Sequence, residues 1–286
     1  MKAKVTFLGN ESPYLQVINE HALLHLVVCE KVSWKVKKYF GSSYVFAQEN
    51  NIPVVSPENY ISKPIDTDII IVSGYPKLIP PKIITHPDIA IVNIHHSLLP
   101  AYRGRHPLNW AIINGEKYTG ITIHQVNEKY DDGKIILQER VKIGSEDTIM
   151  DVYHKTVEKG KELLKKLLTK VIKDGISGSV QNKQLGSYFP PRIPKEGRIS
   201  WKEPAVKIKN LVRALVEPYP GAYFYYKGKK VILEKVRVIE SRSINGDIGK
   251  PILNNGIVFV KTGRGTLEIL KVRNCNRNMG KFMNIK

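Results

Sequence analysis

Long apolar runs and cysteines are what this sequence has least of. Although 42% of its 286 residues are hydrophobic, no apolar run reaches the ~18 residues that a membrane-spanning helix needs. The first residues, Met1 to Phe7, pass directly into a strand-like pattern without the apolar core of a signal peptide. The two cysteines, Cys29 and Cys275, have no spacing typical of a disulfide framework or a metal site. We therefore expect a soluble, cytoplasmic protein with free thiols and no membrane partner.

Acidic residues are also scarce: 26 Asp and Glu stand against 45 Lys and Arg, which gives a formal net charge of +19. Such a balance favours polyanionic or phosphorylated partners, among them nucleic acids, nucleotides and anionic membrane surfaces. The lysines are spread over the whole chain, however, and a solvated surface accounts for the charge equally well. The charge by itself does not choose between these interpretations.

The first half of the chain alternates short apolar runs with polar or helical stretches, a pattern typical of a parallel sheet covered on both faces. The runs are Val5–Leu8, Leu23–Cys29, Ile69–Ser73 and Ile89–Ile94. We therefore expect an open α/β domain with a mainly parallel sheet. Such sheets bind ligands at the carboxyl ends of their strands, where the strand order reverses. The residues that follow the runs are Gly9 and Asn10, Ser73 to Tyr75, and Asn93 to His96.

The second half predicts a long helix, a linker and a small second domain. Apolar residues recur at helical spacing between Thr148 and Lys173, which predicts one long helix from near Asp147 to around Gly175. By contrast, Ser177–Lys195 is rich in Gly, Ser, Asn, Gln and Pro and indicates a linker. We place a domain boundary near residue 185, with domains at 1–185 and 186–286. After a helix at Ala205–Val216, short strands predict a β-rich barrel similar to an oligonucleotide-binding fold. The strands are Ala222–Tyr226, Val231–Val238, Ile257–Lys261 and Thr266–Val272, and Asn274–Lys286 is interpreted as a frayed basic tail.

The most informative stretch for chemistry is Ile91–Pro107. Residues two apart in a strand point to the same face, so Asn93 and His95 are expected to present an amide and an imidazole side by side. An imidazole takes or gives a proton near neutral pH, and an amide donates a hydrogen bond to an oxygen on which negative charge develops. This pair is a candidate site for acyl chemistry.

A second stretch, Gly120–Ile135, reads as a strand followed by an acidic turn that contains Asp131, Asp132 and Gly133. A carboxylate on such a loop holds the orientation of a histidine and favours its protonated form. Spacing alone does not establish that the carboxylate meets His95.

Together, the two stretches resemble the N10-formyltetrahydrofolate-dependent formyltransferases. The family pattern is Asn-x-His-x-Ser-Leu-Leu-Pro followed by Arg-Gly, with Asp-x-Gly downstream. This sequence matches the pattern at Asn93, His95, Ser97–Pro100, Arg103-Gly104 and Asp131-x-Gly133. The likeness extends to Ser73–Pro80, which is similar to the family's folate-side loop, and to Glu196–Trp201 and Pro218–Ala222, which are similar to the start of its C-terminal domain.

The resemblance implies a Rossmann-like catalytic domain and a ternary complex in which an amine attacks the formyl carbon of the folate. It implies that Asn93 and His95 stabilise the oxyanion, that His95 assists proton transfer, and that Asp131 orients or charges the imidazole. N10-formyltetrahydrofolate is then the co-substrate, and no metal is expected. The implied folate contacts are Tyr75, Leu78, Ile79, Pro80, Val126 and Gly133, and the expected acceptor contacts are Asn10, Ser97, Arg103 and Arg105.

Several assignments have alternatives. Asp132 competes with Asp131 for the catalytic role, although the position two residues before Gly133 fits the family pattern. Arg103 and Arg105 either cap a turn or bind phosphate, since a guanidinium fork suits phosphate oxygens. The other histidines of these stretches are interpreted as structural or substrate-side: His96, His106 and His124.

Two branches of the family differ in the amine that they formylate. Methionyl-tRNA formyltransferases carry a basic, glycine-containing insertion after the second strand, and Glu30–Phe40 has charge but no Arg-Pro-Ala-Gly-Arg-like insertion. Tyr102–Trp110 is similar to the version in enzymes that formylate nucleotide-linked amino sugars, including the domain that acts on 4-amino-4-deoxyarabinose. We therefore expect a nucleotide-linked amino sugar, and with it a role in lipopolysaccharide biosynthesis and, by analogy, a homodimer. A tRNA acceptor is the alternative.

A third hypothesis comes from another class of protein. Under this hypothesis, the chain is a basic protein that binds nucleic acid through its barrel and has no catalytic turnover. Retention of Asn93, His95 and Asp131 argues against it. Such a protein is expected to bind generic RNA with a steep salt dependence and to show no folate-dependent reaction.

Overall fold

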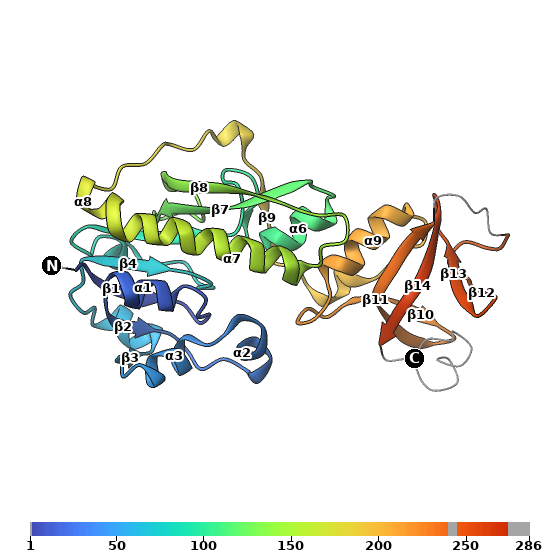
Figure 1. Cartoon of the computed structure of the whole chain (residues 1–286), viewed down its shortest axis with the longest axis horizontal. Helices are drawn as coiled ribbons and strands as arrows, with labels where there is room; N and C mark the ends of the chain where they lie inside the picture. Colours follow the sequence, from blue (N-terminus) through green and yellow to red (C-terminus); the bar gives the residue numbers. More distant parts are fainter. Residues whose placement is uncertain (1, 240–244, 274–286) are drawn as a thin grey trace. The chain divides into compact units, whose positions relative to one another are not determined.

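The computed structural model describes residues 2–239 and 245–273, which fold into two compact units (Figure 1). The first unit takes the described residues of 1–107, 118–142 and 153–190, and the second those of 108–117, 143–152 and 191–286. The predicted domain boundary near residue 185 stays a prediction; in the structure, residues 186–190 group with the first unit. The segment Asn274–Lys286, interpreted above as a basic tail, and Cys275 within it lie outside the described residues.

Among the described residues, the first unit is built on a seven-stranded sheet with the order β3-β2-β1-β4-β5-β7-β8. The strands from β3 to β5 are parallel, and β7 and β8 continue the sheet in antiparallel fashion. This arrangement confirms the predicted fold class. The strands are β1 (Lys4–Leu8), β2 (Leu23–Val28), β3 (Val54–Val55), β4 (Ile69–Val72), β5 (Ala90–His95), β7 (Tyr118–Gln125) and β8 (Ile135–Lys142).

The central strands are continuous apolar runs because both of their faces are covered. All four residues of β4 are buried, and so are four of the five residues of β1. The strand order reverses between β1 and β4, since β2 and β3 lie on one side of β1 whereas β4 and β5 lie on the other. The carboxyl ends of β1, β4 and β5 therefore form the edge at which a ligand site is expected.

Helices connect and cover these strands, and local sequence sets where several of them begin. Ser42 and Ser56 accept hydrogen bonds from the backbone at the starts of α3 and α4, and Pro57 occupies the first turn of α4. The helices of this part are α1 (Leu15–His21), α2 (Trp34–Phe40), α3 (Ser43–Glu49), α4 (Pro57–Ser62) and α5 (Pro81–Ile84).

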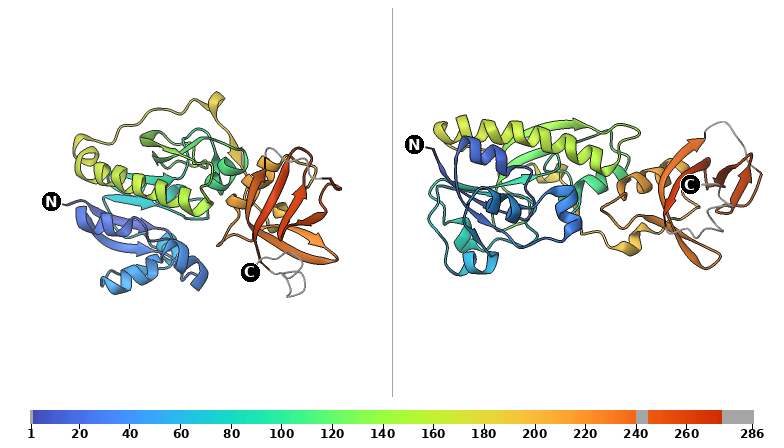
Figure 2. Two further views of the ribbon diagram at one scale, coloured as in Figure 1. Left: turned by 45° about the vertical axis from the view of Figure 1, so that its right-hand side comes forward. Right: turned by 60° about the horizontal axis from the view of Figure 1, so that its bottom comes forward.

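The long helix predicted from Asp147 to Gly175 is found as α7 (Ile149–Lys166), a π-helical turn η1 (Leu167–Val171) and α8 (Ile172–Asp174). The π turn was not predicted. The helix packs on the first unit through Thr156, whose hydroxyl lies 2.8 Å from Nδ1 of His96, and through Gly160, beside the Tyr14 ring. Figure 2 shows α7 running across the first unit from two further sides.

The second unit contains the helices α6 (Pro107–Ile113) and α9 (Ala205–Ala214), a 3-10 turn η3 (Pro194–Gly197) and a five-stranded antiparallel sheet. Its apolar core includes Ile208, Phe224 and Val260. This β-rich architecture confirms the predicted class, whereas closure into a barrel stays a prediction. The sheet has the order β10 (Ala222–Tyr226), β11 (Lys229–Ile239), β14 (Thr266–Arg273), β13 (Ile257–Lys261) and β12 (Pro251–Asn254).

The segment interpreted as a linker, Ser177–Lys195, is packed in part, and that interpretation is corrected. Its strand β9 (Tyr188–Phe189) pairs in parallel with β6 (Arg103–Gly104), and it also contains a 3-10 turn, η2 (Lys183–Leu185). Gln181 is only 5% exposed. Composition indicated a linker because Gly, Ser and Pro do not form helices or long strands by themselves. In this protein, the backbone of the loop after β5 provides the hydrogen-bond partners of β9.

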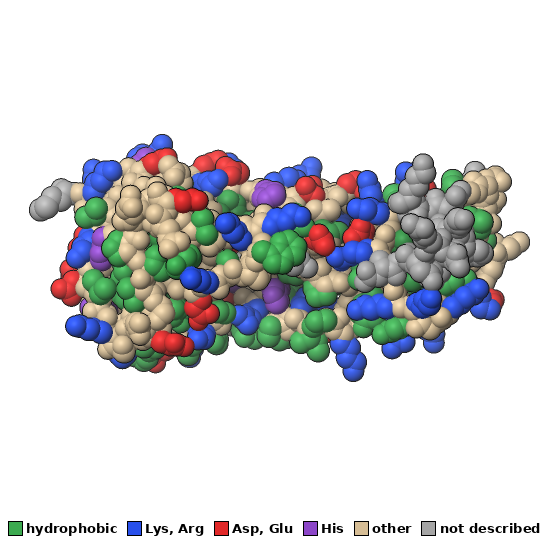
Figure 3. Space-filling model, turned by 90° about the horizontal axis from the view of Figure 1, so that it is seen from below, with side chains coloured by type: hydrophobic (Ala, Val, Ile, Leu, Met, Phe, Trp, Pro, Cys, Tyr) green, Lys and Arg blue, Asp and Glu red, His purple; other side chains and the backbone are tan. Residues whose placement is uncertain are grey.

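The surface carries the positive charge in a dispersed form. Figure 3 shows lysine and arginine side chains scattered over much of the described part of the face that it presents, with carboxylates between them. Several lysines form ion pairs within the first unit, such as Lys159 with Glu162. This distribution favours the interpretation of the charge as a solvated surface.

Candidate active site

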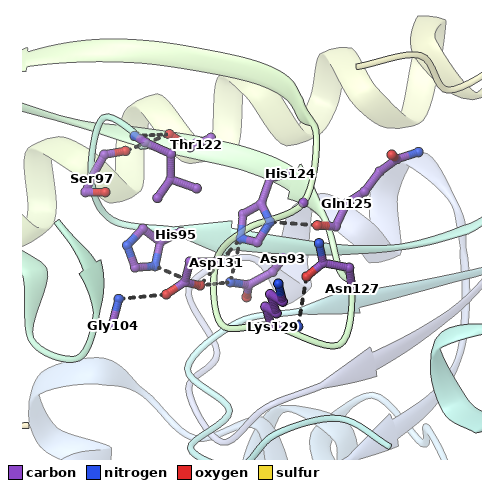
Figure 4. Close-up of polar contacts among 12 residues, drawn as sticks. Asn93, His95, Ser97, Gly104, Thr122, His124, Gln125, Asn127, Lys129 and Asp131 are labelled. Atoms are coloured by element: carbon purple, nitrogen blue, oxygen red, sulfur yellow. Dashed lines mark hydrogen bonds and ion pairs between the residues drawn. The ribbon is translucent and has the colours of Figure 1, made fainter. Parts of the chain in front are cut away.

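The carboxyl end of β5 presents Asn93 and His95, two residues apart, on one side of the strand (Figure 4). The antiparallel register sets Asn93 opposite His124 and His95 opposite Thr122 of β7. On the other side of β5, Val72 of β4 pairs with Asn93. Asn93 therefore lies between the ends of β4 and β7, at the edge where the topology predicts a ligand site.

The acidic loop after β7 brings Asp131 to these two residues. The loop folds tightly back on β7, because a Cβ atom at Gly133 would lie 1.7 Å from the carbonyl oxygen of Gln125. One carboxylate oxygen of Asp131 accepts a 2.8 Å hydrogen bond from the Gly104 amide. The other oxygen lies 3.4 Å from Nδ2 of Asn93 and 3.5 Å from Nδ1 of His95. The structure thus brings Asn93, His95 and Asp131 together.

Both ring nitrogens of His95 face hydrogen-bond acceptors. Nε2 donates to the carbonyl oxygen of Tyr102 at 3.0 Å, and Nδ1 faces the Asp131 carboxylate. The side chain is almost fully buried, and this burial lowers the pKa of His95 below its ordinary value, although Asp131 and the Tyr102 carbonyl act in the opposite direction. The lowered pKa favours the neutral imidazole.

The Asp131 carboxylate is ionised. Burial alone would raise the pKa of Asp131, but the combined effect of His95, of His124 and of the Gly104 amide outweighs it and lowers the pKa well below its ordinary range. The site thus places an ionised carboxylate beside the buried imidazole of His95.

His124, interpreted from the sequence as structural or substrate-side, contacts the same group. Its Nδ1 donates to the carbonyl of Gln125 at 2.7 Å, so in the neutral ring Nε2 carries no proton and accepts from Nδ2 of Asn93 at 3.1 Å. The two amide hydrogens of Asn93 therefore point to His124 and to Asp131. Sequence gave no signal for this contact, because it depends on the register between β5 and β7.

The neighbouring acid, Asp132, has other partners. It binds Nη1 of Arg103 at 3.0 Å and Nζ of Lys183 at 3.1 Å. Asp131 is therefore the carboxylate that faces the histidine, and it is also the one that fits the family pattern two residues before Gly133. His96 is held by Thr156 and stacks on Tyr153, which gives it a structural place.

The four expected acceptor contacts form hydrogen bonds or ion pairs within the protein. The Ser97 hydroxyl is 1% exposed and donates to the carbonyl of Ala101, and Oδ1 of Asn10 accepts from the backbone of Glu30. Arg103 is paired with Asp132, and Arg105 donates to the carbonyl of Pro76 at 3.3 Å. All four side chains hold neighbouring loops, and their part in acceptor binding stays a prediction.

A narrow pocket of about 70 Å³ opens beside the amide and the carboxylate. Asn93 and Asp131 line it directly, and the buried His95 connects to it through Asp131. Four of the six expected folate contacts, Tyr75, Leu78, Ile79 and Val126, line the same pocket, together with Val72, Lys77, His124, Asn127, Lys129 and Tyr130. The other two, Pro80 and Gly133, lie at the start of α5 and at the base of the acidic loop.

Residues 2–239 and 245–273 contain no group of three or more His, Cys, Asp or Glu side chains able to hold a metal ion. Within the same ranges, no helix has both the length and the apolar character needed to span a membrane.

Two family models match the sequence. One, described as formyl transferase, matches residues 45–168, and the other, described as formyl transferase, C-terminal domain, matches residues 192–285.

Curated relatives cover most of the chain. A methionyl-tRNA formyltransferase of Caldanaerobacter subterraneus subsp. tengcongensis is 33% identical over 254 residues, which are 86% of this chain and 82% of that protein. A bifunctional polymyxin resistance protein ArnA of Wigglesworthia glossinidia brevipalpis is 37% identical over 265 residues, which are 87% of this chain; the chain spans 40% of the length of that relative.

Among solved structures, an N-formyltransferase of Helicobacter canadensis, in complex with folinic acid and dTDP-3-aminofucose, superposes with a TM-score of 0.77. The match covers 95% of this chain and 100% of that one at 20% sequence identity, so it shows a shared fold.

Proposed function

Because the chain belongs to the formyl transferase family, we propose that it transfers a formyl group from N10-formyltetrahydrofolate to the amine of a nucleotide-linked amino sugar. The observation that carries this proposal is the convergence of Asn93, His95 and Asp131 at the edge of one pocket. We assign the catalytic roles to these three residues.

The reaction requires a new C–N bond before the old one breaks. The acceptor amine attacks the formyl carbon, its lone pair forms the bond, and the carbonyl electrons move to oxygen. An N–H of Asn93 stabilises that oxyanion. Of the two amide hydrogens of Asn93, the one directed at Asp131 is free to bind the oxyanion. Its hydrogen bond is weak, because Nδ2 of Asn93 lies 3.4 Å from the Asp131 carboxylate, whereas it lies 3.1 Å from Nε2 of His124.

Protons must then leave the attacking nitrogen and reach the folate nitrogen. His95 is neutral and accepts the first proton, and the adjacent Asp131 carboxylate stabilises the imidazolium that forms. The 3.5 Å separation of these groups is expected to shorten in the complex, as such contacts often do when substrate binds. Collapse of the intermediate breaks the bond to N10 of the folate, and His95 returns the proton to that nitrogen.

The pocket beside Asn93 suits a pterin in its chemistry but is narrow. Tyr75, Ile79 and Val126 give apolar walls, whereas Lys77 and Lys129 offer cations to the carboxylates of a folate tail. Its volume of about 70 Å³ is below the ~300 Å³ at which ligand pockets generally begin. We therefore propose that the loops carrying Leu78 and Tyr130, which are 47% and 51% exposed, move apart when folate binds.

A nucleotide-linked amino sugar is the acceptor that we propose. Glu30–Phe40 lacks an Arg-Pro-Ala-Gly-Arg-like insertion, and Tyr102–Trp110 is similar to the version in amino-sugar enzymes. The Helicobacter canadensis structure with dTDP-3-aminofucose shows that its similar fold accommodates such a ligand. A homodimer, cytoplasmic location and a role in lipopolysaccharide biosynthesis are proposed with it by analogy.

A second candidate function is formylation of methionyl-tRNA. It is favoured by one observation, the 33% identity to a methionyl-tRNA formyltransferase across 82% of that protein. The dispersed positive charge is compatible with both acceptors, since each carries phosphate.

Parallel assays with the two kinds of acceptor test the proposal. We expect formyl transfer from N10-formyltetrahydrofolate to at least one member of a panel of dTDP- and UDP-linked amino sugars, measured by mass spectrometry of the product. Methionyl-tRNA in a parallel assay is expected to give no product. Product on the tRNA alone would support the second candidate. No product with any acceptor, together with salt-sensitive binding of generic RNA, would support the non-catalytic nucleic-acid binder.

Replacement of Asp131 by asparagine tests the carboxylate. The expected result is a loss of kcat of about 100-fold, comparable to a misplacement of a catalytic group by an ångström. Because Asp131 raises the pKa of His95, its neutralisation should move the acid limb of kcat/KM to lower pH. The pH-rate profiles of both proteins check this, with Asp174→Asn, at the end of α8, as a control. An unchanged profile would remove Asp131 from this role.

A further inference from the structure

The segment from Gln181 to Phe189, here called the strap, contacts the acidic loop that carries Asp131 and the loop after β5 that carries Tyr102. Near its beginning, the side-chain amide of Gln181 donates to the carbonyl oxygens of Asp131 at 2.8 Å and of Gly133 at 2.7 Å. Gln181 is 5% exposed, and both of its amide hydrogens are used in this way. The strap therefore binds the backbone of the acidic loop at Asp131 and at Gly133.

One of the two residues that Gln181 binds, Asp131, has a strained backbone conformation. Asp131 has a φ of +50°, in the left-handed region that residues other than glycine seldom adopt. A backbone held in this region persists only where its surroundings fix it, and such residues cluster at functional sites. If the backbone of Asp131 relaxed to a negative φ, its carboxylate would leave the Gly104 amide and His95. The hydrogen bonds from Gln181 oppose that relaxation.

The other end of the strap holds the loop after β5. The Tyr102 amide donates to Oγ of Ser187 at 2.9 Å, and the Ser187 amide donates to the carbonyl of Pro100 at 3.2 Å. Tyr102 is also left-handed, with a φ of +58°, and its carbonyl accepts the hydrogen bond from Nε2 of His95. Its ring stacks on Phe189 with the centroids 4.9 Å apart.

We infer that Gln181 and Ser187 are positioning residues for formyl transfer: Gln181 fixes Asp131 at His95, and Ser187 fixes the Tyr102 carbonyl that holds the far side of the His95 ring. This inference rests on the proposed function, because it needs Asp131 and His95 to be catalytic. It goes beyond that function in assigning a task to a segment that composition indicated to be a linker. Neither residue touches the pocket; each acts through a backbone group.

Gln181→Met is the main test, because methionine fills nearly the same volume but has no hydrogen to donate. We expect kcat to fall roughly 10- to 100-fold, by analogy with the loss caused by removing a hydrogen-bond partner that orients a metal-binding side chain. KM for N10-formyltetrahydrofolate should change less than kcat, since Asp131 is the only pocket-lining residue that Gln181 holds directly. Gln184→Met, an exposed glutamine of the same segment, is the matched control and should keep the parent kcat.

A titration of His95 separates positioning from general stability. The titratable groups that face His95 are Asp131 from the acidic loop, His124 from β7 and the adjacent His96. Of these, Asp131 raises the pKa of His95, so loosening Asp131 should lower that pKa further. NMR titration of the imidazole nitrogens in Gln181→Met should therefore show a shift to lower pH, which Gln184→Met should not. An unshifted His95 with normal kcat in Gln181→Met overturns the inference.

Ser187→Ala and a double-mutant cycle complete the test. Ser187→Ala removes a single hydrogen bond from a partly buried site, so it keeps the inference testable if Gln181→Met does not fold; normal kcat in Ser187→Ala would then overturn it. If Gln181 acts through Asp131, Gln181→Met should cost much less kcat in the Asp131→Asn background than in the parent protein. If the effects of Gln181→Met and Asp131→Asn on the free energy of activation were fully additive, the inference would be contradicted.

Different results would contradict the catalytic assignment of Asp131 and the positioning role of the strap. Parent-like turnover in Asp131→Asn would contradict the catalytic assignment itself. Loss of turnover in Asp131→Asn together with parent-like turnover in Gln181→Met would leave the assignment standing and overturn only the role of the strap.

Discussion

Replacement of His95 by alanine is expected to lower kcat by about 100- to 10,000-fold, the range that a positioned general acid–base group typically contributes. His95 is the neutral base of the proposed site, and its Nδ1 lies 3.5 Å from the ionised Asp131. Without the ring, the proton of the attacking amine has no acceptor that is stabilised by that carboxylate. Single-turnover rates with formyl-folate and a competent acceptor measure the effect.

The control for this variant is His154→Ala, because His154 is an exposed histidine on α7. It should leave kcat unchanged. Thermal unfolding of His95→Ala should remain cooperative, which separates lost chemistry from lost structure. A His95→Ala protein with the parent rate would discard the proposed proton transfer.

The parent protein should also show the lowered pKa of His95 in its pH-rate profile. Burial lowers that pKa from its ordinary value of about 6.5, and the reaction needs the neutral ring. Activity should therefore rise with pH through a midpoint below that value and stay high at neutral pH. A midpoint above it would contradict the lowered pKa, and activity that falls as the pH rises through the midpoint would mean that His95 works in its protonated form.

Replacement of Asn93 by alanine is the second large effect that we expect. Loss of one oxyanion donor typically costs about 100- to 1,000-fold in kcat. The amide is fixed by His124 and Asp131 and lines the pocket, so its removal deletes a donor that is already in place. The rate constant for formyl transfer should fall, whereas folate binding, followed by fluorescence or calorimetry, should change far less.

Asn59→Ala provides the comparison for this variant, because Asn59 is an exposed asparagine on α4. Asn93→Ala also leaves Nε2 of His124 without its amide partner, so its stability must be measured beside its activity. If kcat is unchanged while the fold is intact, Asn93 does not stabilise the oxyanion. A rise in KM with unchanged kcat would instead assign it to substrate binding.

Local pattern sufficed for the fold class and for part of the site. The apolar runs that became β1, β2, β4 and β5 could be read directly, because strands buried on both faces are continuous and apolar. The pair Asn93 and His95 followed from the two-residue period of a strand. The spacing of Asp131 to Gly133 gave a motif, but not the contact with His95.

Contacts between segments far apart in the chain were missed. His124 meets Asn93 only because β5 and β7 pair in one particular antiparallel register. Gln181 lies in a stretch whose Gly, Ser and Pro content indicated a linker, yet it is buried against Asp131 and Gly133. Nothing in the residues next to Gln181 marks it, since its partners are backbone carbonyls some 50 positions away.

By itself, then, the sequence determined what depends on neighbours along the chain: the strands and helices, the mainly parallel sheet, and an amide and an imidazole on one strand. Only the tertiary structure decided that Asp131 and His124 meet that pair and that Gln181 binds the backbone of the acidic loop. The physical reason is that side-chain periodicity is a local property of the backbone. Strand register and loop closure, by contrast, are fixed by packing and hydrogen bonding between segments that the sequence separates.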